Sequence, residues 1–203
     1  MKKKKGYKVR RRKGKSRFWI GLIVVVILAI AYSSQSGTIF KKFLYPYPYR
    51  AMIEEYGERY NVDPLLVISV IRAESKFLPQ SQSHKGALGL MQLMPDTAKW
   101  IAETIGDKSY SEDLLREPEK NIQYGTWYIA SLQKEFEELI LVLAAYNGGR
   151  GHVNKWIESH QLDLENLNIE DIPFKETKEY VAKVIDNYEN YKKLYGKEET
   201  RLQ

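Results

Sequence analysis

Cysteine is absent from this chain of 203 residues. Its absence excludes disulfides, thiolate zinc sites, cysteine nucleophiles and a lipid tail anchored on cysteine. Proline is sparse, at seven residues, and no segment has the alternating apolar pattern that predicts a β-strand. Hydrophobic residues still make up 43% of the chain, which is enough for the core of one domain. We therefore expect a mainly α-helical domain with an appendage at one end.

Acidic residues are missing from residues 1–17, which hold eleven of the 32 lysines and arginines. The remainder contains 21 basic and 26 acidic residues, a net charge of about −5. The overall charge of +6 therefore belongs to a basic tail. This distribution argues against nucleic acid as a partner of the folded part.

An uncharged apolar run, FWIGLIVVVILAIAY, follows the basic tail at residues 18–32. A helix over 18–34 approaches the length that crosses a hydrocarbon core of roughly 30 Å. The basic tail predicts a single-pass anchor with a cytoplasmic N-terminus and the remainder outside the cell membrane. The alternatives are a cleaved signal, with Ala29 and Ala31 in a small-x-small site and a secreted product, and a buried helix of a soluble protein.

The rest of the chain divides into a linker over 35–49, a domain over 50–197 and a tail over 198–203. The linker ends in Tyr-Pro-Tyr-Pro-Tyr, where each proline disfavours helix in the residue before it. In the domain, Asp63 and Pro64 predict the start of a buried helix that carries Glu74 in its last turn. Periodicity and capping residues predict further helices over 50–60, 95–105, 121–136, 138–146, 151–159 and 174–195.

Glu74 is the only carboxylate between Arg72 and Pro95. It follows a run of apolar residues, so it should lie where a buried helix reaches the surface. A carboxyl held against apolar walls has a raised pKa, in the range that suits a general acid. The alternative interpretation is a solvated glutamate at a helix end.

Two polar corners accompany this carboxyl. Gly86 and Gly89, beside Met91 and Gln92, indicate backbone bent around a side-chain amide that can both donate to and accept from sugar groups. Tyr146-Asn147-Gly-Gly is a second corner of aromatic and amide groups at a predicted helix end. Taken alone, its Asn-Gly-Gly is also explained as a helix C-cap.

Four motifs in order between roughly residues 50 and 190 resemble the soluble-lytic-transglycosylase family of peptidoglycan-cleaving enzymes. They are Glu74-Ser75, the run GALGLMQLMP at 86–95, Ala145-Tyr-Asn-Gly148 and Ile172-Pro-Phe-x-Glu-Thr-x-x-Tyr-Val181. The resemblance implies a lysozyme-like fold, which would follow the N-terminal helix in the chain. It implies that the glycan strands of peptidoglycan are the partner. The reaction it implies is cleavage of the bond that joins N-acetylmuramic acid to N-acetylglucosamine, which leaves a 1,6-anhydromuramic end.

The resemblance also implies roles for individual residues. Glu74 is the single catalytic acid and base. The residues expected to bind substrate are Ser83, Gln92, Met94, Tyr146 and Asn147, with Glu176 and Tyr180 closing the cleft from the last helix. Lys178 stands where an arginine is common in the family.

Other chemistries find less support. An ordinary glycosidase needs a second carboxylate, and the neighbouring Asp96 and Glu103 lie outside the motifs. The three histidines, His84, His152 and His160, lack metal-ligand spacing, and we expect neither a metal nor a cofactor. The alternatives that stay open are a hydrolytic muramidase on the same fold and a non-catalytic peptidoglycan-binding module.

Overall fold

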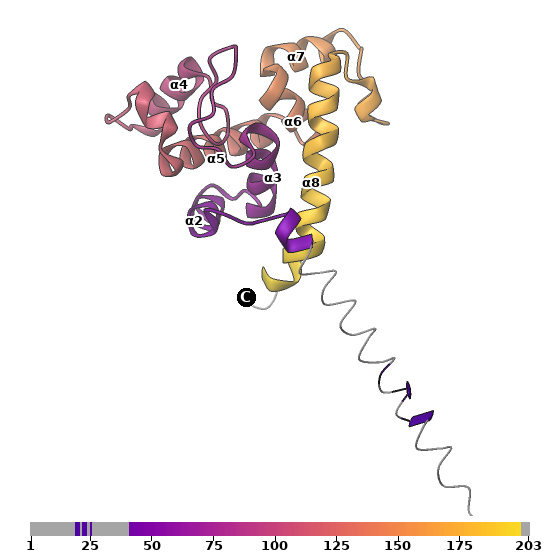
Figure 1. Ribbon diagram of the computed structural model, residues 1–203. Helices are drawn as coiled ribbons and strands as arrows, with labels where there is room; N and C mark the ends of the chain where they lie inside the picture. Colours follow the sequence, from indigo (N-terminus) through magenta and orange to yellow (C-terminus); the bar gives the residue numbers. More distant parts are fainter. Residues whose placement is uncertain (1–18, 21, 24, 26–40, 200–203) are drawn as a thin grey trace, which may run out of the picture. The chain divides into compact units, whose positions relative to one another are not determined.

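The structure is a computed structural model that describes residues 19, 20, 22, 23, 25 and 41–199 (Figure 1). The predicted basic tail over 1–17 and most of the predicted transmembrane helix over 18–34 lie outside the described residues. Among the residues that are described, no helix combines the length and the apolar character needed to cross a membrane.

The described part of the folded domain is mainly helical, as the sequence predicts (Figure 1). The α-helices are α2 (Arg50–Tyr60), α3 (Pro64–Ser75), α4 (Pro95–Ile105), α5 (Pro118–Glu135), α6 (Leu139–Gly148), α7 (Arg150–Glu158) and α8 (Lys175–Glu199). Two short 3₁₀-helices, η1 (Glu112–Arg116) and η2 (Ile169–Asp171), lie in connections where the sequence predicts no element.

Local capping chemistry explains where the best-predicted helices begin and end. The Asp63 carboxylate accepts a hydrogen bond of 2.7 Å from the Leu65 amide, and Pro64 occupies the first turn of α3. Helix α4 ends at Gly106, which adopts the left-handed conformation with φ of 75°. Both features agree with the sequence, because an aspartate N-cap and a glycine C-cap act through neighbouring residues alone.

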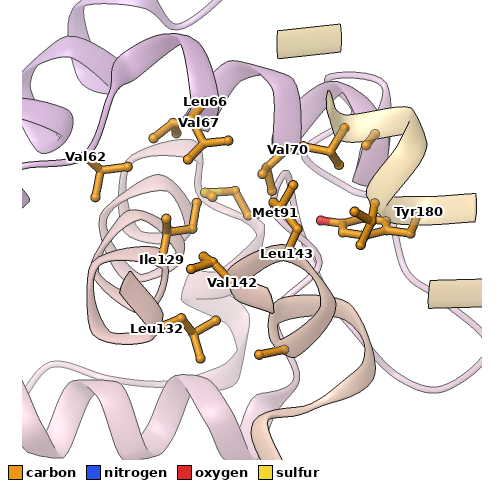
Figure 2. Close-up of a cluster of buried hydrophobic side chains, with 14 of the residues drawn as sticks. Val62, Leu66, Val67, Val70, Met91, Ile129, Leu132, Val142, Leu143 and Tyr180 are labelled. Atoms are coloured by element: carbon orange, nitrogen blue, oxygen red, sulfur yellow. The ribbon is translucent and has the colours of Figure 1, made fainter. Parts of the chain in front are cut away.

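The main core lies between α8 and the helices α3 and α6, against which α8 packs. Residues from α3, the loop before α4, α5, α6 and α8 meet in this core, as Figure 2 shows for Val70, Met91, Ile129, Leu143 and Tyr180. A smaller apolar cluster joins α4, η1 and α5 through Ile101, Leu115, Tyr124 and their neighbours. Glu74 is carried by a helix of the main core.

The compact unit begins at Tyr45, ahead of residue 50, the predicted boundary of the domain. The hydroxyls of Tyr191 and Tyr195 on α8 donate hydrogen bonds of 2.7 and 2.8 Å to the main-chain oxygens of Pro46 and Tyr45. The rings of Tyr45 and Tyr47 pack edge-on against the same α8 tyrosines. Residues 45–49 of the predicted linker are therefore part of the fold, because their aromatic rings bury apolar surface on α8.

Candidate active site

The candidate catalytic carboxyl belongs to Glu74, in the last turn of α3. The preceding residues Val70, Ile71 and Ala73 are buried in the main core, and Glu74 is half-buried. Burial is the largest cause that raises the pKa of Glu74 from an ordinary 4.5 to about 7, because a desolvated carboxylate loses the stabilisation that water gives its charge. The direction of this shift agrees with the expectation from the apolar residues that precede Glu74.

Two groups of α8 oppose this shift. The Tyr180 hydroxyl and the positive charge of Lys183 each lower the pKa of Glu74, by less than burial raises it. The Tyr180 hydroxyl is buried and has no hydrogen-bond partner of normal geometry among the described residues. Its effect on the pKa of Glu74 places the Tyr180 hydroxyl near the Glu74 carboxyl.

Tyr146 brings a second phenol towards Glu74, from the last turns of α6. Burial, and next the negative charge of Glu74, raise the pKa of Tyr146 well above its ordinary value. The Tyr146 hydroxyl donates a hydrogen bond of 2.8 Å to the main-chain oxygen of Met91. Tyr146 therefore holds the loop before α4 beside Glu74, and its hydroxyl oxygen still has acceptor capacity.

Ser83 and Gln92 stabilise the loop between α3 and α4. The Ser83 hydroxyl oxygen accepts a hydrogen bond of 2.9 Å from the Ala87 amide. The Gln92 side-chain nitrogen donates to the main-chain oxygens of Gly89, at 2.8 Å, and Ser81, at 3.2 Å. Both amide hydrogens of Gln92 therefore bind the loop, and the polar atom that remains for a sugar is the Gln92 side-chain oxygen, an acceptor.

A buried asparagine, Asn121, fixes the same loop from α5. Its side-chain oxygen accepts from the Met91 amide at 2.7 Å, and its nitrogen donates to the oxygens of Leu88 and Leu115 at 3.0 and 2.8 Å. At Gly89 a Cβ atom would lie 2.2 Å from this nitrogen, so only glycine fits. The tight turn predicted from the glycines is present, whereas the sequence does not single out Asn121.

Asn147 and Glu176 line one cavity of about 480 Å³, together with Lys85. The Lys85 ammonium lies 3.4 Å from the Glu176 carboxylate, and both side chains are exposed. Met94 does not line this cavity, and its side chain is 41% exposed ahead of α4. Six of the seven predicted binding residues thus fall into three groups: Tyr146 and Tyr180 at Glu74, Ser83 and Gln92 in the loop, and Asn147 with Glu176 at the cavity. Met94 belongs to none of them.

No second carboxylate acts on Glu74 among the described groups that shift its pKa. Asp96 instead raises the pKa of Tyr110, after burial and Glu112, and Glu103 is exposed on α4. In the described part of the chain, no three histidine, aspartate or glutamate residues are arranged to hold a metal ion. The arrangement around Glu74 is therefore that of one carboxyl with a raised pKa, two phenols and one ammonium group.

Lys183 is the residue of this group that the sequence does not reveal. Its ammonium donates a hydrogen bond of 2.5 Å to the main-chain oxygen of Ala73, next to Glu74 in the chain. Lys183 lies three residues after Tyr180 on α8, on the same helix face. That spacing is the only sequence signal that could have found it.

Several known proteins are similar to this chain in sequence. The family model described as the transglycosylase SLT domain matches residues 51–168. The chain is 32% identical over 161 residues to the soluble lytic murein transglycosylase of Salmonella typhimurium, covering 78% of this chain and 25% of that protein. It is 33% identical over 168 residues to the membrane-bound lytic murein transglycosylase C of Edwardsiella ictaluri, covering 72% of this chain and 47% of that protein.

Solved structures of lytic transglycosylases are also similar to this chain. The 70 kDa soluble lytic transglycosylase of Escherichia coli superposes with a TM-score of 0.71 at 30% identity, over 77% of this chain and 26% of that one. An inactive mutant of the lytic transglycosylase Slt of Pseudomonas aeruginosa gives a TM-score of 0.68 at 32% identity, over 75% of this chain and 25% of that one. The chain thus spans about a quarter of the length of the soluble relatives that it matches.

Proposed function

The chain belongs to the transglycosylase SLT domain family, and from this premise we propose that it is a peptidoglycan lytic transglycosylase whose single catalytic carboxylate is Glu74. Its substrate is the glycan strand, cut between N-acetylmuramic acid and N-acetylglucosamine. The product carries a 1,6-anhydromuramic end. The relatives that are named lytic murein transglycosylases support this substrate and reaction.

The observation that carries the proposal is the raised pKa of Glu74, about 7, beside two phenols, with no second carboxylate among the described residues acting on it. A carboxyl with this pKa is part protonated and part ionised at neutral pH. It can therefore donate a proton in one step and accept one in the next, since a general acid and a general base are most effective when the pKa lies near the working pH.

The reaction needs two proton transfers and no water. The protonated Glu74 gives its proton to the glycosidic oxygen as the bond to the muramic C1 breaks. The carboxylate that remains then takes the proton of the muramic C6 hydroxyl, whose oxygen forms the new bond to C1. The acetamido oxygen of the substrate stabilises the positive charge at C1 between these steps.

Nearby polar groups orient the substrate in this proposal. The hydroxyl oxygen of Tyr146 and the side-chain oxygen of Gln92 are acceptors suited to an N-acetyl N–H. The Tyr180 hydroxyl donates to the Glu74 carboxylate once the first proton has left. Ser83, Met94, Asn147 and Glu176 contribute the remaining sugar contacts.

Mass spectrometry of the released products tests the function. Wild-type protein incubated with purified cell wall is expected to release muropeptides with anhydro ends, and Glu74→Gln is expected to release none. Glu103→Gln, which removes an exposed acid of α4, is the matched control and keeps the activity. Products heavier by one water would identify a hydrolytic muramidase instead. Binding to the wall without release of fragments would identify a non-catalytic module.

We also propose that residues 18–34 anchor the domain in the cell membrane, with the basic tail in the cytoplasm and the domain outside. The charge-free apolar run beside eleven basic residues supports this topology. A cleaved signal would put the same domain outside the cytoplasm. Cell fractionation together with the N-terminal sequence of the mature protein separates the two, because a cleaved product begins after residue 31 and is not retained by the membrane.

A further inference from the structure

A row of aromatic rings runs from Tyr146, beside Glu74, to the exposed Trp100 on α4. The Tyr146 ring lies 5.4 Å from Tyr128, and the Tyr128 ring lies 6.3 Å from Trp100. Trp127 completes the row, with its ring 5.3 Å from Trp100. Trp100 is therefore one ring removed from a residue of the proposed catalytic group.

Trp100 lies at the outer edge of the smaller apolar cluster. Trp127, Tyr128 and Tyr146 all pack against that cluster. The Trp100 ring contacts the first two of these rings and is 37% exposed. Its indole therefore presents apolar surface to solvent from a supported position, and tryptophan is enriched at binding interfaces because its large ring carries one polar N–H.

Arg150, the first residue of α7, covers one side of this ring. Its guanidinium carbon lies 5.4 Å from the centre of the Trp100 ring. Two nitrogens of the same guanidinium bind one oxygen of Glu135, at 3.0 and 2.5 Å, and Asn154 binds the other oxygen at 2.9 Å. The guanidinium is thereby held in place beside the Trp100 ring.

We infer that Trp100, supported by Arg150, is a distal subsite for the glycan strand, and this inference rests on the proposed function. A strand cut at Glu74 must continue beyond the scissile bond, and the row of rings is continuous with Glu74 through Tyr146. The apolar face of a sugar ring packs on the indole, while the hydroxyl and acetamido groups at its edge reach the guanidinium, a donor without acceptor capacity. Since these side chains are already held in place, little conformational entropy is lost on binding.

The subsite has a specific consequence for substrate preference. We expect long glycan strands to contact both Glu74 and Trp100, and a disaccharide bound at Glu74 to leave Trp100 unoccupied. Loss of the Trp100 ring should therefore weaken the binding of long strands and leave the binding of short ones unchanged. Peptide-free oligomers are a suitable probe, because the indole is expected to contact the sugar ring itself.

Calorimetric titration of the Glu74→Gln protein with peptide-free oligomers of β-1,4-linked N-acetylglucosamine tests the inference. Adding Trp100→Leu, which keeps apolar bulk, is expected to weaken binding of long oligomers about tenfold, the effect of roughly 1.4 kcal/mol, and to leave the disaccharide unchanged. Trp100→Tyr should restore most of the affinity. Lys99→Ala, at the exposed neighbour on α4, is the matched control and has no effect.

The inference would be overturned if the proteins with and without the Trp100→Leu substitution bound each oligomer with the same affinity, whatever its length. This holds provided that both proteins give the same thermal unfolding curve. Length-independent weakening would overturn it as well, because it would indicate a structural role for the indole. This outcome is separate from the test of the proposed function. If Trp100→Leu weakens binding of long oligomers only, but the wild-type protein releases no anhydro products, the subsite is supported and the enzymatic function is rejected. If anhydro products are released but Trp100→Leu does not change binding, the enzymatic function is supported and the subsite is rejected.

Discussion

Glu74 and Asp107 are two carboxylates of the same domain that lie in opposite surroundings. Glu74 ends a helix of the main core, and burial raises its pKa to about 7. Asp107 lies after α4, where Lys120 and then Ser109 hold its pKa well below the ordinary 3.8. Its oxygens bind the Lys120 ammonium at 2.6 Å, the Ser109 hydroxyl at 2.6 Å and the Tyr124 hydroxyl at 2.8 Å.

The difference separates a carboxyl suited to chemistry from one suited to structure. Asp107 has donors on both oxygens and an ammonium beside it, so it stays ionised and joins the loop after α4 to α5. Among the residues that the structure describes, none forms an ion pair with Glu74, and the Lys183 ammonium donates a hydrogen bond to the Ala73 oxygen. A proton can therefore leave and return at Glu74 near neutral pH.

The largest contrast is expected in activity. Glu74→Gln should lower the rate of anhydro-product release by roughly 10²–10⁴-fold, the usual contribution of general acid–base catalysis. Asp107→Asn should leave the rate per folded molecule within about twofold of wild type. The rates are measured on purified cell wall below the unfolding temperature of both variants. Comparable loss in both variants would mean that Glu74 acts only through the fold.

Stability should respond to pH in opposite directions at the two sites. Because its pKa is raised in the folded state, Glu74 makes a contribution to the free energy of unfolding that is present below pH 4.5 and lost as pH rises through about 7. Glu74→Gln should therefore match wild type near pH 4 and be more stable by about 3 kcal/mol at pH 8, at 1.36 kcal/mol per pKa unit. The check is chemical denaturation at both pH values.

The depressed pKa of Asp107 has the opposite sign. The contribution of Asp107 to the free energy of unfolding is present above pH 3.8 and is lost as pH falls through the pKa of Asp107 in the folded state. Asp107→Asn should cost about 1.5–3 kcal/mol at pH 7, the range for hydrogen bonds to charged groups, and less at pH 2. Denaturation curves of the wild type and the variant at the two pH values give the difference in the free energy of unfolding that tests this prediction. A variant as stable as wild type at pH 7 would contradict a structural role for Asp107.

The smallest effect is expected at Lys183, a positioning residue. Its positive charge lowers the pKa of Glu74, so Lys183→Met should raise that pKa and move the alkaline fall of the activity to higher pH. We expect a change of roughly two- to threefold in relative rate at pH 8, since one pKa unit is tenfold. Lys183→Arg keeps the charge and should keep the profile. A uniform loss at every pH would indicate a purely structural role.

The sequence predicts the Glu74 side of this comparison well, because the relevant signals are local. The apolar run of α3, the Asp63 cap and the glycine turn act over a few residues. The resemblance implies that Tyr146 and Tyr180 bind substrate, and the structure places both near Glu74. The direction in which the pKa of Glu74 moves agrees with the sequence, whereas the roles of these residues stay predictions.

Contacts between distant residues could not be predicted in the same way. Asn121 is 30 residues from the Met91 amide that it binds, and Lys183 is 110 residues from Ala73. Helical periodicity assigns such residues to a face and says nothing of the partner. For residues 45–49, local proline rules favoured a linker, but burial of tyrosine rings on α8 outweighed them.

The most direct test of the account is a carbon-13 NMR titration of the side-chain carboxyls, with Glu74→Gln and Asp107→Asn used to assign the two signals. The expected result is a Glu74 midpoint near 7 and an Asp107 midpoint below 3.8. A Glu74 midpoint near its ordinary 4.5 would contradict the central claim, because the carboxyl would then hold no proton to give at neutral pH.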